Sequence, residues 1–311
     1  SGGDAPGMNA AVRAVVRSAL YRGFKVLGVR RGYNGLIHGD LFEMNLRSVS
    51  DIIHRGGTML FTARCPEFNT EAGMQQAISV CNDAGIDGIV VIGGDGSFRG
   101  ARDLSNRGIN CVGIPGTIDN DIACTDYTIG YDTAMNTAMD MVDRIRDTAQ
   151  SHDRCSVVEV MGRNAGYIAL NTGIAVGASY ILVPEMKPDM DAVLEKIEKS
   201  RALGKKHFII VVAEGIGHAK EIAQEIEEKT GIESRETVLG HVQRGGNPTV
   251  TDRVVASQMG YHAVELLHQG IGNRVVAQTD GKIVDYDIQE ALKMKKELPM
   301  DLYQIAHDIS F

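Results

Sequence analysis

The stretch IDGIVVIGGDGSFRG, residues 86–100, joins an apolar run to a glycine-rich turn. Positions 89–92 are all β-branched, which favours a buried strand, and we expect that strand over residues 86–94. Gly94 and Asp95 then lead into a helical segment. Glycines let backbone N–H groups approach an anion, and the helix N-terminus adds a favourable partial charge. The stretch therefore predicts a strand–loop–helix unit with an anion-binding loop.

The same alternation of strand and helix runs along the chain. Further apolar runs that predict buried strands are residues 24–29, 109–116, 155–162, 179–185 and 207–215. A helix is expected over residues 131–148, where one face carries Ala134, Ala138, Met141, Val142 and Ile145. Such alternation predicts an α/β fold with parallel sheets covered by helices on both faces. At about 100–200 residues per domain, 311 residues predict two lobes.

Composition excludes several classes of function. Net charge is −8 and no Lys/Arg block of five appears, so nucleic acid is not an expected partner. Neither a run of about 18 apolar residues nor a signal-peptide leader is present, so no membrane association is expected. The 5 cysteines contain no C-x-x-C pair, which predicts reduced thiols in the cytoplasm. The sequence opens in a loop, and we expect a strand to precede it.

Two Gly-Gly-Asp loops are candidates for phosphate binding. One lies in SGGDAPGMNA, residues 1–10, and the other contains Asp95. Mg²⁺ takes one or two carboxylates plus water and substrate phosphates, so Asp95 is the candidate metal ligand, with a helix N-cap as the alternative. The phosphate-lysine motif is absent, and Gly94, Gly96 and Gly100 miss the dinucleotide spacing. A nicotinamide dehydrogenase is therefore only a minor alternative.

The stretch GIPGTIDNDI, residues 113–122, places Asp119 and Asp121 two positions apart. Carboxylates that close repel unless a cation, a proton or solvent separates them. The loop is therefore either an ordinary polar turn or a loop built around chemistry.

Arginines in or beside glycine- and proline-rich loops are candidate phosphate clamps, because guanidinium binds phosphate oxygens bidentately. They are Arg64, Arg163, Arg235 and Arg244. A separate basic set comprises Arg13, Arg17, Arg146 and the segment 204–207. It is either a solvated face or a second anion site.

Together these motifs closely resemble bacterial ATP-dependent 6-phosphofructokinases. The matching motifs, in chain order, are SGGDAPGMNAAVR, HRGGT, TARCPEF, VVIGGDGS, PGTIDNDI, TDYTIGYDTA, VVEVMGRNAG and TVLGHVQRGGNP. The resemblance covers essentially the whole chain and implies two similar lobes, each a mostly parallel sheet sandwiched by helices. By resemblance, residues 1–129 with 242–292 form a larger ATP-binding lobe. Residues 130–241 with 293–311 form a smaller fructose 6-phosphate-binding lobe.

The resemblance implies phosphoryl transfer from MgATP to the 1-hydroxyl of fructose 6-phosphate, the committed step of glycolysis, by an allosteric homotetramer. Asp119 would be the catalytic base, Thr117 and Arg163 would steady the transferring phosphoryl, and Asp95 would hold Mg²⁺. Implied nucleotide contacts are Gly3, Arg64, Cys65, Gly94, Asp95, Gly96 and Ser97. Implied sugar-phosphate contacts are Thr117, Ile118, Asp119, Met161, Gly162, Arg163, Glu214, His241, Val242, Gln243 and Arg244. Arg154 and Arg235 would come from a neighbouring subunit.

Two glycines indicate whether the phosphoryl donor is ATP or pyrophosphate. Pyrophosphate-using relatives carry Asp where Gly96 stands and Lys where Gly116 stands, so the resemblance favours ATP. A pyrophosphate-dependent enzyme, a non-catalytic sugar-phosphate sensor on the same fold, and other substrates such as tagatose 6-phosphate are the alternatives.

An effector site for ADP or phosphoenolpyruvate is also implied. Its matching residues are Arg13, Arg17, Asp51, Arg146, Gly177, Lys205, Lys206 and His207. The pattern departs at Leu46 and Leu203, where basic residues are expected, and at Ser179, which replaces a glutamate. We expect the remaining cations to hold an effector phosphate.

Overall fold

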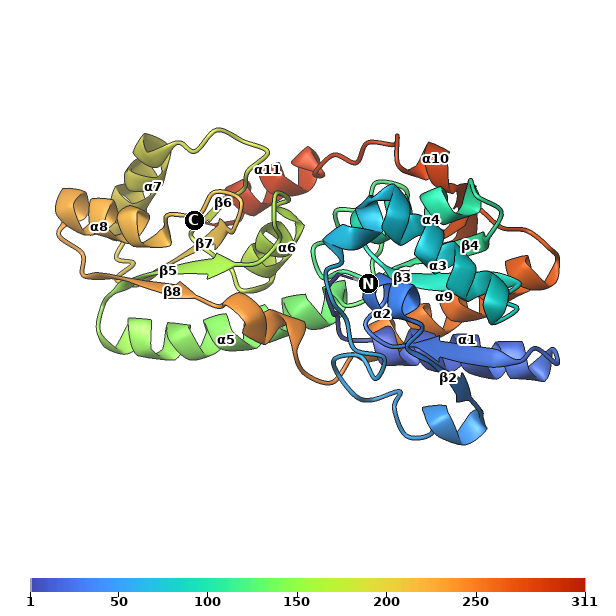
Figure 1. Cartoon of the computed structure of the whole chain (residues 1–311). Helices are drawn as coiled ribbons and strands as arrows, with labels where there is room; N and C mark the ends of the chain where they lie inside the picture. Colours follow the sequence, from blue (N-terminus) through green and yellow to red (C-terminus); the bar gives the residue numbers. More distant parts are fainter. Residues whose placement is uncertain (1, 311) are drawn as a thin grey trace. The chain divides into compact units, whose positions relative to one another are not determined.

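A computed structural model describes residues 2–310, and these divide into two compact units. Unit 1 comprises residues 2–118, 122–133 and 244–296. Unit 2 comprises residues 119–121, 134–243 and 297–310. Figure 1 draws both units coloured along the sequence.

Unit 1 is built around a four-stranded sheet of order β10-β9-β4-β3. Its strands are β3 (Gly88–Gly93), β4 (Asn110–Pro115), β9 (Arg274–Thr279) and β10 (Lys282–Asp287). Strands β3, β4 and β9 are parallel, and β10 is antiparallel at one edge. A separate antiparallel pair joins β1 (Val26–Val29) to β2 (Leu41–Met44).

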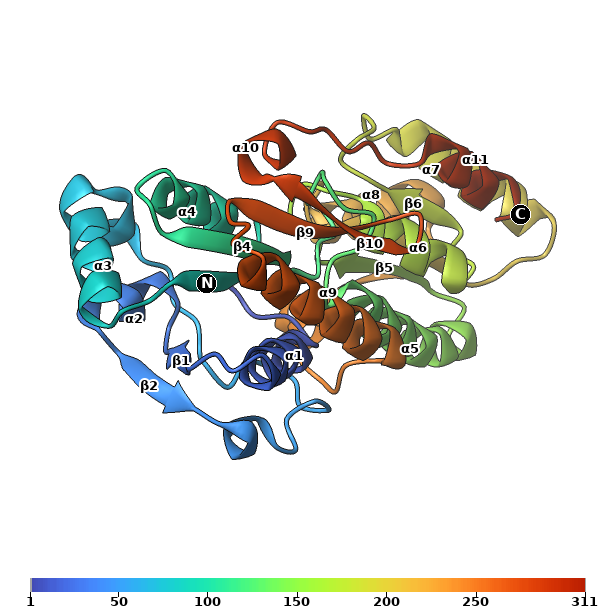
Figure 2. The same cartoon turned by 90° about the vertical axis from the view of Figure 1, so that its right-hand side faces the viewer.

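Helices cover both faces of this sheet (Figure 2). One face packs against α1 (Met8–Tyr21) and α9 (Val250–His268). The other packs against α2 (Tyr33–His38), α3 (Glu71–Asp83), α4 (Asp95–Ser105) and α10 (Ile288–Ala291). The short helices η1 (Leu46–Val49) and η2 (Pro66–Asn69) complete the unit. The glycine at position 260 lets α1 and α9 approach closely, since a Cβ there would lie only 2.7 Å from the Ala14 Cβ.

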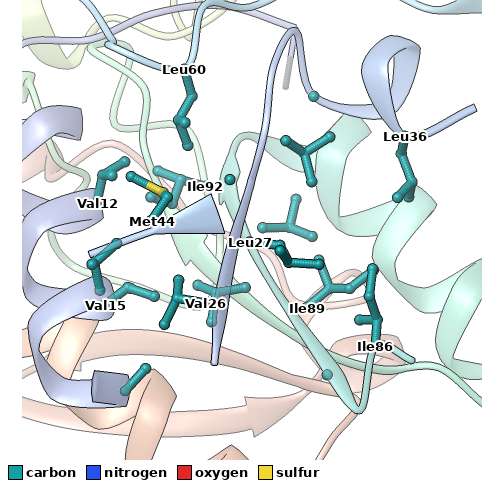
Figure 3. A pocket seen from close by; sticks show the side chains of 18 of the residues that line it. Val12, Val15, Val26, Leu27, Leu36, Met44, Leu60, Ile86, Ile89 and Ile92 are labelled. Atoms are coloured by element: carbon teal, nitrogen blue, oxygen red, sulfur yellow. The ribbon is translucent and has the colours of Figure 1, made fainter. Parts of the chain in front are cut away.

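An apolar cavity of about 350 Å³ lies beside β3 in unit 1 (Figure 3). Figure 3 shows Val12 and Val15 of α1, Leu27 of β1 and Ile89 and Ile92 of β3 around it. Strand β3 is an edge strand of the described sheet, and β1 contributes lining residues along its whole length. The cavity explains why most of β1 is only half-buried.

Unit 2 is built around a parallel sheet of order β6-β7-β5-β8. Its strands are β5 (Cys155–Val160), β6 (Tyr180–Leu182), β7 (Phe208–Ala213) and β8 (Ser234–Val238). Its helices are α6 (Tyr167–Ala175), α7 (Met190–Ala202), α8 (Ala219–Thr230) and α11 (Met300–Asp308). Helix α5 (Tyr131–Ser151) begins in unit 1 and continues into unit 2, and η3 (Gly240–Arg244) ends at their boundary. In Figure 1, α7 and α8 cover one face of the sheet and α5 lies on the other.

The predicted α/β class is confirmed, with mostly parallel sheets flanked by helices. Each of the six predicted strands forms, and the helix expected over 131–148 runs from Tyr131 to Ser151. The expectation of parallel sheets is wrong for the segment 24–29. This segment forms β1, which pairs antiparallel with β2 outside the larger sheets. No helix in the part of the chain that the structure describes is long and apolar enough to cross a membrane.

Candidate active site

The second Gly-Gly-Asp loop connects β3 to α4 at the carboxyl end of the strand. Gly94 is the N-cap, and its carbonyl accepts the N–H groups of Ser97 at 2.9 Å and Phe98 at 3.1 Å. Asp95 is the first residue of α4 and is half-buried. A Cβ placed on Gly96 would meet no atom within 4 Å, so the backbone there is open to a ligand.

The donor set around Asp95 fits a magnesium ion that travels with a nucleotide. Over residues 2–310, no group of three or more His, Cys, Asp or Glu side chains is arranged to hold a metal. Mg²⁺ needs no such cage, because it keeps several waters and takes its other oxygens from substrate phosphates. Asp95 offers one carboxylate at the start of a helix, where phosphates are also favoured.

The loop that carries Asp119 leaves the neighbouring strand. The Gly116 N–H donates to the Gly93 carbonyl at 3.0 Å, so this loop and the Gly-Gly-Asp loop start side by side from β4 and β3. Asp119 is 9% exposed and Ile118 is 2% exposed. Asn120 is buried and has a φ of 52°, in the left-handed region. Non-glycine residues held in that region cluster at functional sites.

Gly116 and Gly96 differ in their surroundings. A Cβ at Gly116 would lie 2.9 Å from the Met8 terminal methyl and 3.1 Å from the Ile92 Cγ2, whereas the space at Gly96 is open. Packing therefore gives a reason for glycine at 116 that does not involve a ligand. At 96 the structure offers no packing reason, and the open backbone fits a role in nucleotide binding.

Asn9 joins the start of α1 to the segment 54–59, which contains the HRGGT motif. Its side chain is buried, donates to the carbonyls of Arg55 at 3.1 Å and Gly56 at 3.2 Å, and accepts the Met59 N–H at 2.7 Å. A Cβ at Gly56 would lie 2.3 Å from the Gly246 carbonyl oxygen, so the HRGGT and QRGGN motifs meet. Sequence reasoning missed Asn9, although a polar residue in an otherwise apolar first turn was a signal.

The other nucleotide candidates also lie in unit 1. Arg64 is exposed, and Cys65 is half-buried against the core beside η2. A Cβ on Gly3 would meet no atom within 4 Å. Gly3 alone of these lines the apolar cavity, whose walls are mostly hydrophobic side chains.

In unit 2, the turn after β5 is held by a carboxylate. Glu214 Oε2 accepts the backbone N–H groups of Gly162 at 3.2 Å and Arg163 at 3.0 Å. Gln243 is fully buried, and its Oε1 accepts the Met161 N–H at 2.8 Å. Arg163 has a φ of 58° and is exposed, and it has no ion-pair partner among the residues described. The turn therefore holds a strained arginine whose guanidinium is available to an anion.

The two arginines expected from a neighbouring subunit lie together in unit 2. Arg154 pairs with Glu233 at 2.8 Å, and Arg235 pairs with the same carboxylate at 2.5 Å. Hydrogen bonding and charge from Arg154, with the charge of Arg235, lower the pKa of Glu233. Of the remaining candidates in η3, His241 and Val242 are exposed and Arg244 is half-buried.

The candidate effector residues are distributed over both units. Arg13 and Arg17 lie on α1, and Asp51 has a φ of 54°, all in unit 1. The remaining five, in unit 2, are Arg146, Gly177, Lys205, Lys206 and His207.

Three of the unit 2 cations lie near one another. Arg146 donates to the Val176 carbonyl beside Gly177. Burial, together with the charge of Arg146, lowers the pKa of Lys205, and both effects act on His207 as well. The positive charge of Arg146 thus acts on both neighbours, which makes this an electropositive cluster suited to an anion. Lys206 lies 3.9 Å from Asp153 instead.

The three departures from the family pattern have different environments. Leu46 is 52% exposed and Leu203 is 80% exposed, whereas Ser179 is buried.

Comparison with known proteins places these motifs in one family. A family model described as phosphofructokinase matches residues 1–267. The ATP-dependent 6-phosphofructokinase of Clostridium botulinum strain Hall is 58% identical over 310 residues, which cover 100% of this chain and 97% of that protein. The corresponding protein of strain Alaska E43 is 55% identical over 311 residues, with the same coverage.

Solved structures agree. Phosphofructokinase from Saccharomyces cerevisiae superposes with a TM-score of 0.89 at 36% identity; the match covers 99% of this chain and 46% of the yeast chain. A pyrophosphate-dependent phosphofructokinase from Marinobacter aquaeolei has a TM-score of 0.85 at 24% identity, covering 96% of this chain and 84% of that chain, which shows the shared fold alone. The resemblance that the motifs predicted is confirmed, and the chain belongs to the phosphofructokinase family.

Proposed function

We propose that the chain transfers the γ-phosphoryl group of MgATP to the 1-hydroxyl of fructose 6-phosphate, giving fructose 1,6-bisphosphate and ADP. The observation that carries the proposal is the hydrogen bond from Gly116 to Gly93, which starts the nucleotide loop and the Asp119 loop side by side. Relatives 58% identical over the whole chain carry the name of this enzyme. We further propose that unit 1 binds the nucleotide and that unit 2 binds the sugar phosphate.

The chemistry assigned to this chain's residues is positioning, proton transfer and charge stabilisation. Asp119 takes the proton of the 1-hydroxyl. At the same time the hydroxyl oxygen bonds to the γ-phosphorus, and the bond between that phosphorus and the ADP oxygen breaks. A base in that position typically contributes about 10²–10⁴-fold. Thr117 and Arg163 hold the phosphoryl oxygens, where fixed donors and cations stabilise the charge of the transition state. Mg²⁺, held through Asp95, would neutralise charge on the nucleotide phosphates.

The sugar phosphate is assigned to the remaining candidates, most of which lie in unit 2. Glu214 and Gln243 fix the backbone at Met161, Gly162 and Arg163, so these residues present a defined turn to the sugar. We assign Ile118, His241, Val242 and Arg244 to the same ligand. Arg154 and Arg235 would bind its 6-phosphate from a neighbouring subunit of a homotetramer.

ATP is the proposed donor because of Gly96. An Asp side chain there would occupy the open space beside the backbone and repel a nucleotide phosphate. The free cysteines, four of them buried, fit a reducing compartment, and we propose the cytoplasm.

Regulation is proposed at the cluster formed by Arg146, Lys205 and His207, with Arg13, Arg17, Asp51, Gly177 and Lys206 as further effector contacts. ADP and phosphoenolpyruvate both carry phosphates that such cations can bind.

Steady-state assays on the purified protein test the proposal. Fructose 6-phosphate is supplied with ATP or with pyrophosphate, and fructose 1,6-bisphosphate formation is followed. We expect turnover with ATP and at most trace turnover with pyrophosphate. Faster turnover with pyrophosphate would overturn the assignment of ATP as the donor. Tight binding of fructose 6-phosphate without turnover would favour a non-catalytic sugar-phosphate sensor.

A further inference from the structure

Asp252 is a fully buried carboxylate in the first turn of α9. Its Oδ1 accepts the Tyr127 hydroxyl and the Gly130 N–H, each at 2.6 Å. Its Oδ2 accepts the Thr133 N–H at 2.9 Å and the Thr133 hydroxyl at 2.5 Å. No lysine or arginine pairs with it in the part of the chain described. A buried carboxylate without a cation is costly unless hydrogen bonds compensate, and here four donors do so.

The segment that Asp252 holds, residues 127–133, is itself joined to the catalytic loop. The Ile129 N–H donates to the Pro115 carbonyl at 3.0 Å, and Gly116 forms a β-bridge with Ile129. The Thr128 hydroxyl donates to the Thr117 carbonyl at 2.7 Å. Asp119 lies two residues beyond Thr117, so the route from Asp252 to the proposed base is short.

The first Gly-Gly-Asp loop rests on the same segment. A Cβ at Gly7 would lie 2.7 Å from the Ile129 Cγ2 and 3.4 Å from the Asp252 Cβ. A Cβ at Gly130 would lie 2.6 Å from the Ala5 Cβ. Two candidate loops therefore contact residues that Asp252 fixes.

The Thr133 hydroxyl also links α9 to the start of α5. It accepts the Thr249 N–H at 3.0 Å while it donates to Asp252. The Thr249 hydroxyl in turn donates to Asp132 at 2.6 Å. These bonds fix the first turn of α5 against α9, so the segment 127–133 is held at its far end as well.

From this network we propose that Asp252 is a positioning residue for phosphoryl transfer: through residues 127–133 it fixes the Thr117 carbonyl and with it the loop of Asp119. The inference rests on the proposed function. A carboxylate suits this role because both of its oxygens accept. An asparagine would present an NH₂ donor to two of the four donors and leave them without an acceptor.

Two substitutions separate this role from general stability. Asp252→Asn replaces one of the two accepting oxygens by an NH₂ group. Thr128→Val removes the hydrogen bond to the Thr117 carbonyl while keeping a β-branched side chain. The matched control is Thr172→Val in α6, because Thr172 is buried and its hydroxyl has no hydrogen-bond partner among the described residues.

We expect kcat to fall about 10–100-fold in both variants, because a small displacement of a reacting group can cost about 100-fold. KM for ATP should change less than kcat, because the loop of Asp95 is not part of this network. If Asp252→Asn does not fold, Tyr127→Phe, which removes one of the four donors, takes its place with an expected decrease of about threefold.

Hydrogen exchange of the 115–121 segment gives a readout independent of turnover. We expect faster exchange there in Asp252→Asn and Thr128→Val than in Thr172→Val. If the wild-type protein fails to phosphorylate fructose 6-phosphate, the proposed function falls while this readout still tests the positioning role. Unchanged kcat and unchanged exchange in folded Asp252→Asn, or in its Tyr127→Phe replacement, would overturn the inference. So would control-like behaviour of Thr128→Val.

Discussion

Glu214 accepts the backbone N–H of Arg163 at 3.0 Å and thereby holds that arginine in a left-handed conformation with φ of 58°. The same oxygen accepts the Gly162 N–H, so one carboxylate closes the whole turn. A left-handed conformation costs an L-residue about 1–2 kcal/mol, a cost that glycine avoids. Glycine would avoid this cost, so the strain at Arg163 supports the hypothesis that its side chain acts in the site.

Replacing Arg163 should separate stability from activity. We expect Arg163→Ala to be less stable than Arg163→Gly by about 1 kcal/mol, because alanine keeps the strain that glycine removes. Both should lose about 10²–10³-fold in kcat, since both lack the guanidinium. Urea denaturation and steady-state kinetics check the two parts. Equal stability of the two variants would mean that the turn relaxes, and retained kcat would remove Arg163 from the site.

The two glycines that bear on the donor should respond differently to alanine. Gly116→Ala should lower the free energy of unfolding by about 1 kcal/mol, because the new methyl group crowds the Ile92 Cγ2, whereas the Met8 methyl at the end of its side chain can move aside. Gly96→Ala should not destabilise the protein, because its Cβ meets open space and alanine favours the helix. It should instead raise KM for ATP. Thermal unfolding and ATP titrations measure these effects, and a Gly96→Ala enzyme with unchanged KM would argue against nucleotide contact at this residue.

Glu233 lies between Arg154 and Arg235 and competes with any phosphate for them. Glu233→Gln should therefore lower KM for fructose 6-phosphate a few-fold, with the larger effect at low salt. The control is Glu195→Gln, which breaks an exposed 2.5 Å ion pair with Lys199 on α7. Kinetics at two ionic strengths provide the test. A KM that rises in Glu233→Gln would show that the carboxylate positions the arginines rather than competing with a ligand.

Stability at mildly acid pH should depend on His207. Burial and the charges of Arg146 and Lys205 lower its pKa below the usual 6.5. The unfolded chain therefore binds a proton first as pH falls, and folding stability decreases as pH drops through about 6.5. His207→Gln should show a smaller loss of unfolding free energy between about pH 7.5 and about pH 5.5. Urea titrations at several pH values measure this, and identical slopes for the two proteins would contradict it.

How far the sequence predicts this fold depends on what each strand contacts. Strand β7, FIIVVA, is buried throughout, and its unbroken apolar run made it predictable. Strand β8, SRETV, lies at a sheet edge with most residues exposed, so its composition resembles a loop. The β9–β10 hairpin had a usable signal that was missed, since Asp280 and Gly281 both have positive φ in a two-residue turn.

The candidate site also divides into residues that the sequence predicts and residues that it does not. Its exposed residues lie in glycine-rich motifs that can be recognised in the sequence. Asn9 and Asp252 were not predicted, because their hydrogen bonds reach backbone groups about 50 and about 120 positions away along the chain. Such buried polar residues act through long-range contacts, and no local pattern records where those contacts are.

The account depends most on Asp119 as the base that takes the proton of the sugar hydroxyl. Asp119→Asn keeps the size of the side chain and removes its basicity, so kcat should fall by about 10²–10⁴-fold. Binding of fructose 6-phosphate, measured by calorimetry on the same sample, should stay near that of the wild-type protein. That combination is the predicted result, and an Asp119→Asn enzyme with near wild-type kcat would contradict the account.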